Sequence, residues 1–255
     1  MKSDFKIAIQ LFGQLRMWED QEYLKPFINF LKEQASSVDV FGSFWNDEYS
    51  QQNINKYNTD IFTEYELIPI PDKIFKGLWR WGYCLLKSRN LRYRYQFKNN
   101  KRYDLVIMMR PDLYIKIAKP ELLERFLNSI VAKKYLYKIW TQKVISNSSV
   151  KPFDVDDKCF YATPEAADLF CLGFNHIHNN PENNSHSAYH TDPVSFIKTF
   201  NLIVEPFNII APFANFNLIR HQYLAQKGLT TEKIDDKLKS LKTLDEVKNL
   251  VKEHL

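Results

Sequence analysis

Residues 103–112 read Tyr-Asp-Leu-Val-Ile-Met-Met-Arg-Pro-Asp, an apolar run that ends abruptly in an arginine, a proline and a carboxylate. The five apolar residues are too few for a helix, so they predict a strand buried on both faces. Such strands belong to α/β sheets, whose ligands bind in the crevice beyond the carboxyl ends of the strands. Arg110 and Asp112 lie at that end, and Pro111 stiffens the loop. The loop is a candidate site for a cation and the phosphates that it accompanies.

The composition is that of one large folded domain, or of a domain with an appendage. The chain has 255 residues, 45% of them hydrophobic, which is ample for a core. The net charge of +5 suits a small anionic ligand. A polynucleotide is not required, because basic and acidic residues are mixed along most of the chain.

The three cysteines, Cys84, Cys159 and Cys171, lack the spacing of a metal site and lie in apolar surroundings. We therefore expect buried free thiols, and an odd number without a disulfide pattern favours a reducing compartment. Asp4 lies where a signal peptide needs apolar residues, and no apolar run reaches the length of a membrane span. These features predict a cytoplasmic protein without a transmembrane segment.

Strands and helices are expected to alternate through the first half of the chain, which predicts a doubly wound, mostly parallel sheet. The polar segment 46–58 is expected to be a loop or lid. The expected strands are 6–12, 38–44, 64–69 and 105–109, and the expected helices are 20–34 and 75–98.

The second half predicts a short strand over 113–117, a helix from Pro120, and a strand over 158–162 that leads into a helix at Thr163-Pro164. Residues 175–190, rich in Asn and His, are expected to form a surface loop. It contains His176, His178, His186 and His190, for which an acceptor-side loop is favoured over a metal site. The tail from Thr230 is amphipathic. We expect a catalytic domain at 1–215 and a helical appendage at 216–255, which is a candidate homodimer contact.

Three expected strands end in chemically distinctive loops, at 13–16, 43–45 and 110–112. In a parallel sheet these loops emerge on one edge and can converge. Gly13 lacks a Cβ, so backbone N–H groups can approach a ligand closely, and the Arg16 guanidinium suits diphosphate oxygens. An ordinary turn is the alternative for Gly13. Asp112 can bind a divalent cation; its alternatives are a helix cap or a salt bridge with Arg110.

Residues 79–102 interleave aromatic and basic side chains, a pattern that by itself suggests binding of single-stranded nucleic acid. The helical spacing favours a crossover helix instead, with an aromatic face packed on the sheet and the charges in solvent. A further alternative is that its first turns, around Arg80, bind a small-molecule substrate.

These strand ends resemble those of nucleotide-sugar glycosyltransferases of the GT-A type, above all the small ones of large DNA viruses and bacterial polysaccharide clusters. The resemblance covers roughly residues 5–205 and rests on LFGQLR at 11–16, DVF at 39–41 with Trp45, and YDLV…RPD at 103–112. It implies a GT-A-like, Rossmann-like, mostly parallel sheet flanked by helices, with the helical C-terminal tail. It also implies that these residues bind the donor: Gly13, Gln14, Arg16, Trp45, Arg80, Arg110 and Asp112.

The resemblance places Asp112 at the last carboxylate of the family's Asp-X-Asp metal motif, which implies Mn²⁺ or Mg²⁺ there. Arg110 stands where an acid is common, and it can itself stabilise a departing diphosphate. Inverting transfer needs a general base beside the acceptor hydroxyl. The candidates are Asp192, whose alternative is a plain N-cap, and Asp157, which with Asp156 has a solvated turn as its alternative.

The predicted function is therefore that of a glycosyltransferase, which moves a hexose or pentose from a nucleoside diphosphate sugar to a glycan or another hydroxyl acceptor. No nucleic-acid partner is expected. Two alternatives stay open: a non-enzymatic nucleic-acid-binding protein that uses the helix at 79–102, and a nucleotidyltransferase-type α/β enzyme.

Overall fold

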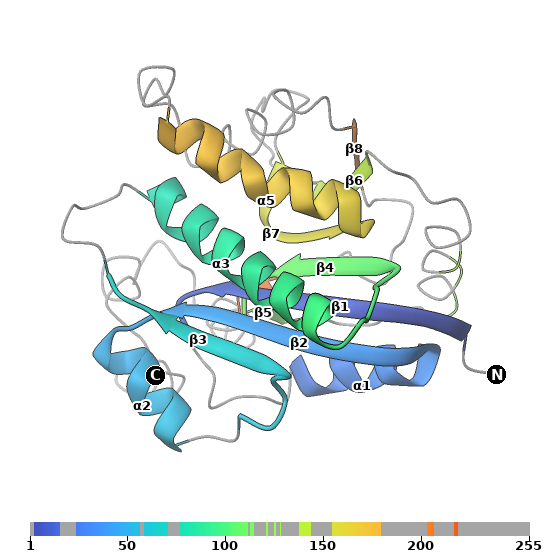
Figure 1. Cartoon of the computed structure of the whole chain (residues 1–255), viewed down its shortest axis with the longest axis horizontal. Helices are drawn as coiled ribbons and strands as arrows, with labels where there is room; N and C mark the ends of the chain where they lie inside the picture. The colour runs from blue at the N-terminus through green and yellow to red at the C-terminus, as the bar shows by residue number, and fades with distance from the viewer. Residues whose placement is uncertain are drawn as a thin grey trace, which may run out of the picture.

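The computed structural model describes residues 3–15, 24–56, 59–70, 77–111, 113–114, 138–143, 155–179, 203–206 and 217–218, and the helical positions 121, 125 and 128. Figure 1 shows a layered α/β arrangement of these parts. The elements are β1 (Ser3–Gly13), α1 (Leu24–Gln34), β2 (Ala35–Trp45), α2 (Glu48–Lys56), β3 (Glu64–Ile68), α3 (Gly77–Lys98), β4 (Leu105–Met109), β5 (Leu113–Tyr114), β6 (Lys138–Lys143), β7 (Val155–Ala162), α5 (Pro164–Asn179), β8 (Ile203–Pro206) and β9 (Asn217–Leu218).

Seven strands form one sheet in the order β3-β2-β1-β4-β7-β6-β8. The pairs β3–β2, β2–β1, β1–β4 and β6–β8 are parallel, whereas β7 is antiparallel to both of its neighbours. The sheet is thus mostly parallel, as predicted, and the arrangement is Rossmann-like. A second sheet pairs β5 with β9, so the chain segment after β4 lies beside residues 217–218, on the other side of the expected domain boundary.

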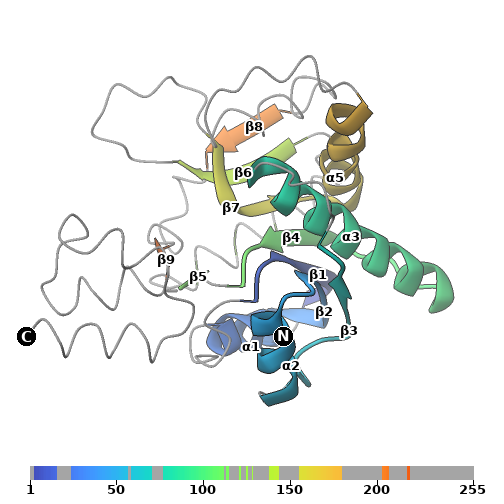
Figure 2. The same cartoon turned by 90° about the vertical axis from the view of Figure 1, so that its left-hand side faces the viewer.

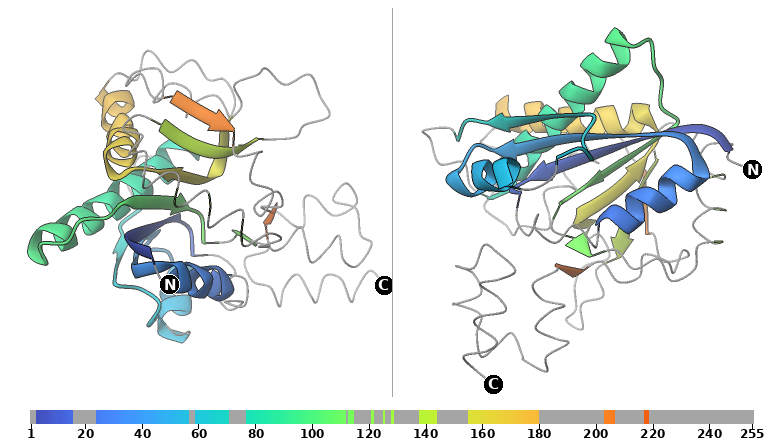
Figure 3. Two further views of the ribbon diagram at one scale, coloured as in Figure 1. Left: turned by 90° about the vertical axis from the view of Figure 1, so that its right-hand side faces the viewer. Right: turned by 90° about the horizontal axis from the view of Figure 1, so that it is seen from below.

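Helices cover both faces of the large sheet: α1 packs on one face, and α3 and α5 pack on the other (Figures 2 and 3). Alternation along β1 produces this arrangement, because successive side chains of a strand point to opposite faces. Ile7, Ile9 and Leu11 join the core under α1, and Ala8 and Phe12 join the core under α3 and α5. Every residue of β4 is buried, so the prediction of a strand covered on both faces is confirmed.

The expectation of a loop or lid over 46–58 is wrong, because Glu48–Lys56 form α2. The helix begins where Asp47 accepts a hydrogen bond from the backbone N–H of Ser50 at 2.7 Å, an N-cap arrangement. Further along, the Asn53 carboxamide donates to the carbonyl oxygen of Leu15 at 3.0 Å. The polar residues that suggested a loop are thus used in capping the helix and in anchoring it to the end of β1.

The expectation of a loop over 175–190 is wrong for 175–179, because α5 continues to Asn179 and includes His176 and His178. Residues 180–190 lie outside the described residues. The strands β6, β8 and β9 were not predicted, and β9 lies in the segment 216–255 that was expected to be helical, so that expectation is wrong at residues 217–218. The three cysteines are buried free thiols, as expected. Arg16, Asp112, Asp192 and the tail from residue 219 lie outside the described residues, so the expectations for them remain predictions. None of the helices in the described ranges has an apolar stretch long enough to cross a bilayer.

Candidate functional site at the carboxyl edge of the sheet

The order of the strands reverses between β1 and β4. From β1 the chain moves outward through β2 and β3, then returns to place β4 on the other side of β1. The register pairs Leu11 with Met109, so Gly13 and Pro111, each two residues further on, lie at the same edge. In open α/β sheets the crevice outside this point of reversal is where ligands bind.

Gly13 has the backbone conformation that the binding-loop prediction needs. Its φ is +109°, which L side chains rarely adopt, and a Cβ placed there would meet no atom within 4 Å. The backbone beyond β1 is therefore open to close approach by another group. The Gly13 carbonyl faces the Cys84 thiol at 3.9 Å, and burial raises the pKa of that thiol far above its usual range.

The residue after Gly13 is fixed by a carboxylate that sequence reasoning missed. The Gln14 carboxamide donates to Asp47 at 2.8 Å, while the other Asp47 oxygen caps α2. Asp47 therefore joins the loop after β1 to the loop after β2. An acid just beyond an expected strand, followed by Ser50 at N-cap spacing, is the sequence signal that could have identified it.

Trp45 lies at this edge but is 8% exposed, and its ring stacks on Tyr83 with centroids 6.1 Å apart. The Lys87 ammonium lies over the other ring of this pair, 5.3 Å from the Tyr83 centroid. Trp45 therefore contributes mainly by holding α3 against the end of β2. The helix has contacts with Gly13 through Cys84 and with the middle of β1 through Arg92, so its first turns, which include Arg80, lie at the carboxyl edge.

Arg110 follows β4 directly and is partly exposed. Asp112 lies outside the described residues, between the buried Pro111 and the short strand β5. On the next strand, β7 runs in the opposite direction and pairs Cys159 with Met109. Asp157, two residues before Cys159, therefore lies at the same edge as Arg110.

The structure thus brings Gly13, Gln14, Trp45, Arg110 and the backbone of Asp157 to one edge, where the early turns of α3 also lie. In the described part of the chain, no group of three or more His, Cys, Asp or Glu side chains could hold a metal ion. The charged side chain described at the end of β4 is a cation. A metal at Asp112 remains a prediction.

The basic helix does not have all its charges in solvent, contrary to the interpretation from its spacing. Arg92 is fully buried and donates to Gln10 at 2.8 Å, to Gln96 at 2.7 Å, and to Asp168 of α5. Arg89 donates to the same Asp168 oxygen at 2.9 Å. Two of the arginines that suggested a nucleic-acid surface are therefore used to join α3, α5 and β1.

The fold defines a Rossmann-like α/β protein whose strand order reverses between β1 and β4. No family model matches the chain, and no curated protein is similar to it at the level of sequence. One similar solved structure is described as "crystal structure of a glycosyltransferase involved in the glycosylation of the major capsid of PBCV-1". The two chains are 9% identical, with a TM-score of 0.42, over 79% of this chain and 82% of the other.

Proposed function

We propose that this protein is a glycosyltransferase that moves a sugar from a nucleoside diphosphate sugar to a hydroxyl group of a glycan or another acceptor. One observation carries the proposal. Gly13, with its open backbone, ends the strand beside the one that Arg110 follows, at the point where the strand order reverses. An anionic donor needs both features, close backbone N–H groups and a fixed cation.

The diphosphate would lie between these two loops. Backbone N–H groups around Gly13 would donate to its oxygens, and the Gln14–Asp47 hydrogen bond would hold the loop in position before the donor arrives. The Arg110 guanidinium would stabilise the negative charge that develops on the leaving diphosphate. Arg16 and Arg80 are further donor contacts, and Asp112 would hold a divalent cation or a sugar hydroxyl.

A general base must reach the acceptor hydroxyl on the far side of the donor sugar. Asp157 is a candidate because the register of β7 with β4 brings its backbone to the edge that Arg110 occupies. Asp192 is the second candidate. Either carboxylate would accept the proton of the acceptor hydroxyl as its oxygen attacks the anomeric carbon and the bond to the diphosphate breaks.

Thermal shift with a panel of nucleoside diphosphates and their sugars tests donor binding, because a ligand that binds the folded state raises its apparent stability. Hydrolysis of the donor, with and without Mn²⁺, then tests the chemistry. The decisive variant is Asp112→Ala, compared with Asp4→Ala, which removes an exposed carboxylate at the opposite end of β1.

We expect one nucleotide to raise the melting temperature, and we expect Asp112→Ala, but not Asp4→Ala, to lose most of the hydrolysis. The proposal is wrong if no nucleotide or nucleotide sugar changes the melting temperature. It is also wrong if Asp112→Ala retains full transfer and hydrolysis.

A further inference from the structure

The positive charge of this chain is concentrated in one segment, Gly77–Tyr103. The segment holds eight of the 35 basic residues and none of the 30 acidic ones, so the rest of the chain has 27 basic against 30 acidic residues. The eight are Arg80, Lys87, Arg89, Arg92, Arg94, Lys98, Lys101 and Arg102. The excess of positive charge therefore belongs to α3 and to the turn that follows it.

Three of these cations form ion pairs within the fold. Arg89 and Arg92 pair with Asp168, and Lys101 pairs with Asp39. The cations toward the end of α3 differ from these, because they point into water.

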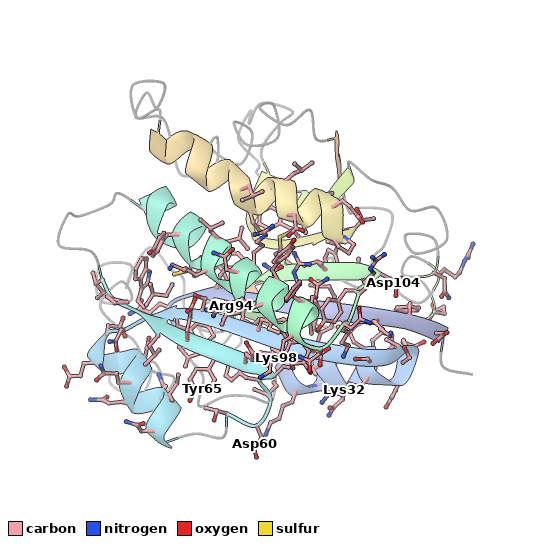
Figure 4. The ribbon with its side chains drawn as sticks, in the orientation of Figure 1. Lys32, Asp60, Tyr65, Arg94, Lys98 and Asp104 are labelled. Carbon is pink, nitrogen blue, oxygen red and sulfur yellow. The ribbon has the colours of Figure 1, made fainter. Side chains whose placement is uncertain are left out.

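The side chain of Arg94 is 67% exposed, and its guanidinium lies 3.9 Å from a carboxylate oxygen of Glu66. An exposed ion pair at this distance is weak. Lys98 and Arg102 are exposed and have no ion-pair partner in the described ranges. Arg94 and Lys98 both lie on the α3 side of the sheet (Figure 4). Three cations therefore remain available to an external anionic partner.

Two aromatic rings stand among these cations. Phe97 is 88% exposed and Tyr93 is 53% exposed, and the spacing of four residues places them on one side of the helix. Figures 2 and 3 show the C-terminal half of α3 projecting from the body of the molecule. We call the exposed side chains Tyr93, Arg94, Phe97, Lys98 and Arg102 the cationic-aromatic face.

We infer that the cationic-aromatic face docks on an anionic membrane surface. A projecting helix end with exposed aromatic rings and surrounding cations suits the headgroup region of a bilayer, where rings insert and cations meet anionic lipids. A single nucleic-acid strand would instead need ring faces free for stacking, and the Arg89 guanidinium already lies over the Tyr93 ring at 4.6 Å.

Docking in this way would leave the candidate site accessible. The first turns of α3 lie at the carboxyl edge with Gly13, whereas Lys101, just beyond its last turn, reaches Asp39 further back along β2. The inference therefore stands apart from the proposed function, and the two can fail separately.

The test is flotation of the full chain with phosphatidylcholine vesicles that contain or lack about one third phosphatidylserine. We expect binding to the anionic vesicles only, and loss of binding when salt rises from about 0.1 M to about 1 M. Each basic side chain near such a surface contributes about fivefold in affinity, so Lys98→Gln/Arg102→Gln is expected to bind about 25-fold more weakly. Phe97→Ala removes an inserting ring, with an expected loss of about tenfold.

Two matched controls keep the test specific. Lys25→Gln/Lys32→Gln removes the same charge from exposed positions on α1, across the sheet, and Ile70→Ala truncates another exposed apolar side chain. Both controls are expected to bind as the unmodified protein does. Equal binding to neutral vesicles, equal losses in controls and test variants, or binding of single-stranded oligonucleotides without binding of anionic vesicles would each overturn the inference.

Discussion

Arg92, which is fully buried on α3, donates to the carboxylate of Asp168 on α5, and the same guanidinium donates to Gln10 in the middle of β1. The Arg92 guanidinium thus joins α3, α5 and β1, and its acceptor on β1, Gln10, lies three residues before Gly13 of the candidate site.

Because Asp168 pairs with two arginines, we expect its removal to lower the free energy of unfolding strongly, and by less when Arg92 is already absent. Asp168→Ala would leave two guanidinium groups facing each other without their anion, and removal of one partner of a buried pair costs about 3 kcal/mol or more. In an Arg92→Met background the same change is expected to cost at least 1 kcal/mol less, because only Arg89 then loses its partner. Urea denaturation of the four proteins of this cycle provides the measurement, and additive costs would contradict the prediction.

We expect Asp47 to stabilise the fold as the N-cap of α2, a role that asparagine can partly take over. Asp47→Ala removes both the acceptor for the Ser50 N–H and the partner of Gln14, with an expected loss of about 1–2 kcal/mol. Asp47→Asn keeps an oxygen at the cap and is expected to lose less than half as much. Glu48→Ala is the matched control, since within the described residues the Glu48 carboxylate accepts a single, exposed hydrogen bond, from Gln52. Its cost is expected to stay within about 0.5 kcal/mol. Equal denaturation midpoints for Asp47→Ala and Glu48→Ala would refute the assignment.

We expect substitution of Gly13 to lower the free energy of unfolding because of its backbone conformation, not because of crowding. Gly13→Ala is expected to lose about 1–3 kcal/mol, because φ is +109° while the added methyl group meets nothing within 4 Å. Gly42→Ala is the contrast, since its Cβ would lie 2.5 Å from the Phe44 ring and 2.8 Å from the Phe62 ring. Truncation of Phe62 to Leu is expected to recover part of the Gly42→Ala loss and none of the Gly13→Ala loss, as measured by thermal unfolding. Recovery in both backgrounds would show that crowding, not the backbone, limits Gly13.

We expect the loss of Arg110 to lower the affinity for nucleoside diphosphates. Hydrogen bonds to charged groups contribute about 1.5–3 kcal/mol, so Arg110→Gln is expected to weaken nucleoside diphosphate binding roughly 10- to 150-fold. Arg94→Gln changes the charge equally at an exposed position on α3 and is expected to leave affinity unchanged. Calorimetric titration measures both variants, and an unaltered dissociation constant for Arg110→Gln would remove Arg110 from the proposed site.

Cys171 predicts a loss of stability at alkaline pH. Burial, with a smaller contribution from the nearby Asp168, raises the pKa of this thiol from 9.0 to about 12. Above pH 9 the unfolded thiol releases its proton while the folded one retains it, so the folded state binds more protons. The free energy of unfolding then falls by up to about 1.4 kcal/mol per pH unit between pH 9 and 12.

Burial and the neighbouring Asp39 also raise the pKa of the Tyr103 hydroxyl, so Tyr103 lowers stability at alkaline pH as well. Replacement of Cys171 separates the contribution of its thiol from that of Tyr103. The cost of Cys171→Ala, measured by urea denaturation, is expected to shrink by about 1 kcal/mol between pH 7.5 and pH 10. A cost that is the same at both values would mean that the thiol does not titrate differently on unfolding.

The sequence by itself determined the central strands and the class of the fold. The uniform apolar run of β4 and the alternation of strand and helix patterns are local signals, and each can be read from a few adjacent residues. The loops at 13–16 and 110–112 were predicted to share an edge because parallel strands carry their carboxyl ends to the same side, and the register of β1 with β4 places the described parts of both loops there.

Only the tertiary structure decided how the polar residues are used. Helical spacing marks which side chains share a face, but Arg92 points inward because its anion arrives from a residue 76 positions away. Residues 48–56 form a helix rather than a loop because Asp47 caps it and Leu15 accepts from Asn53, 38 positions further on. Contacts between distant residues leave no periodic pattern in the sequence. A polar side chain is stable in water, and it is stable inside the protein only when a specific partner forms a hydrogen bond or ion pair with it.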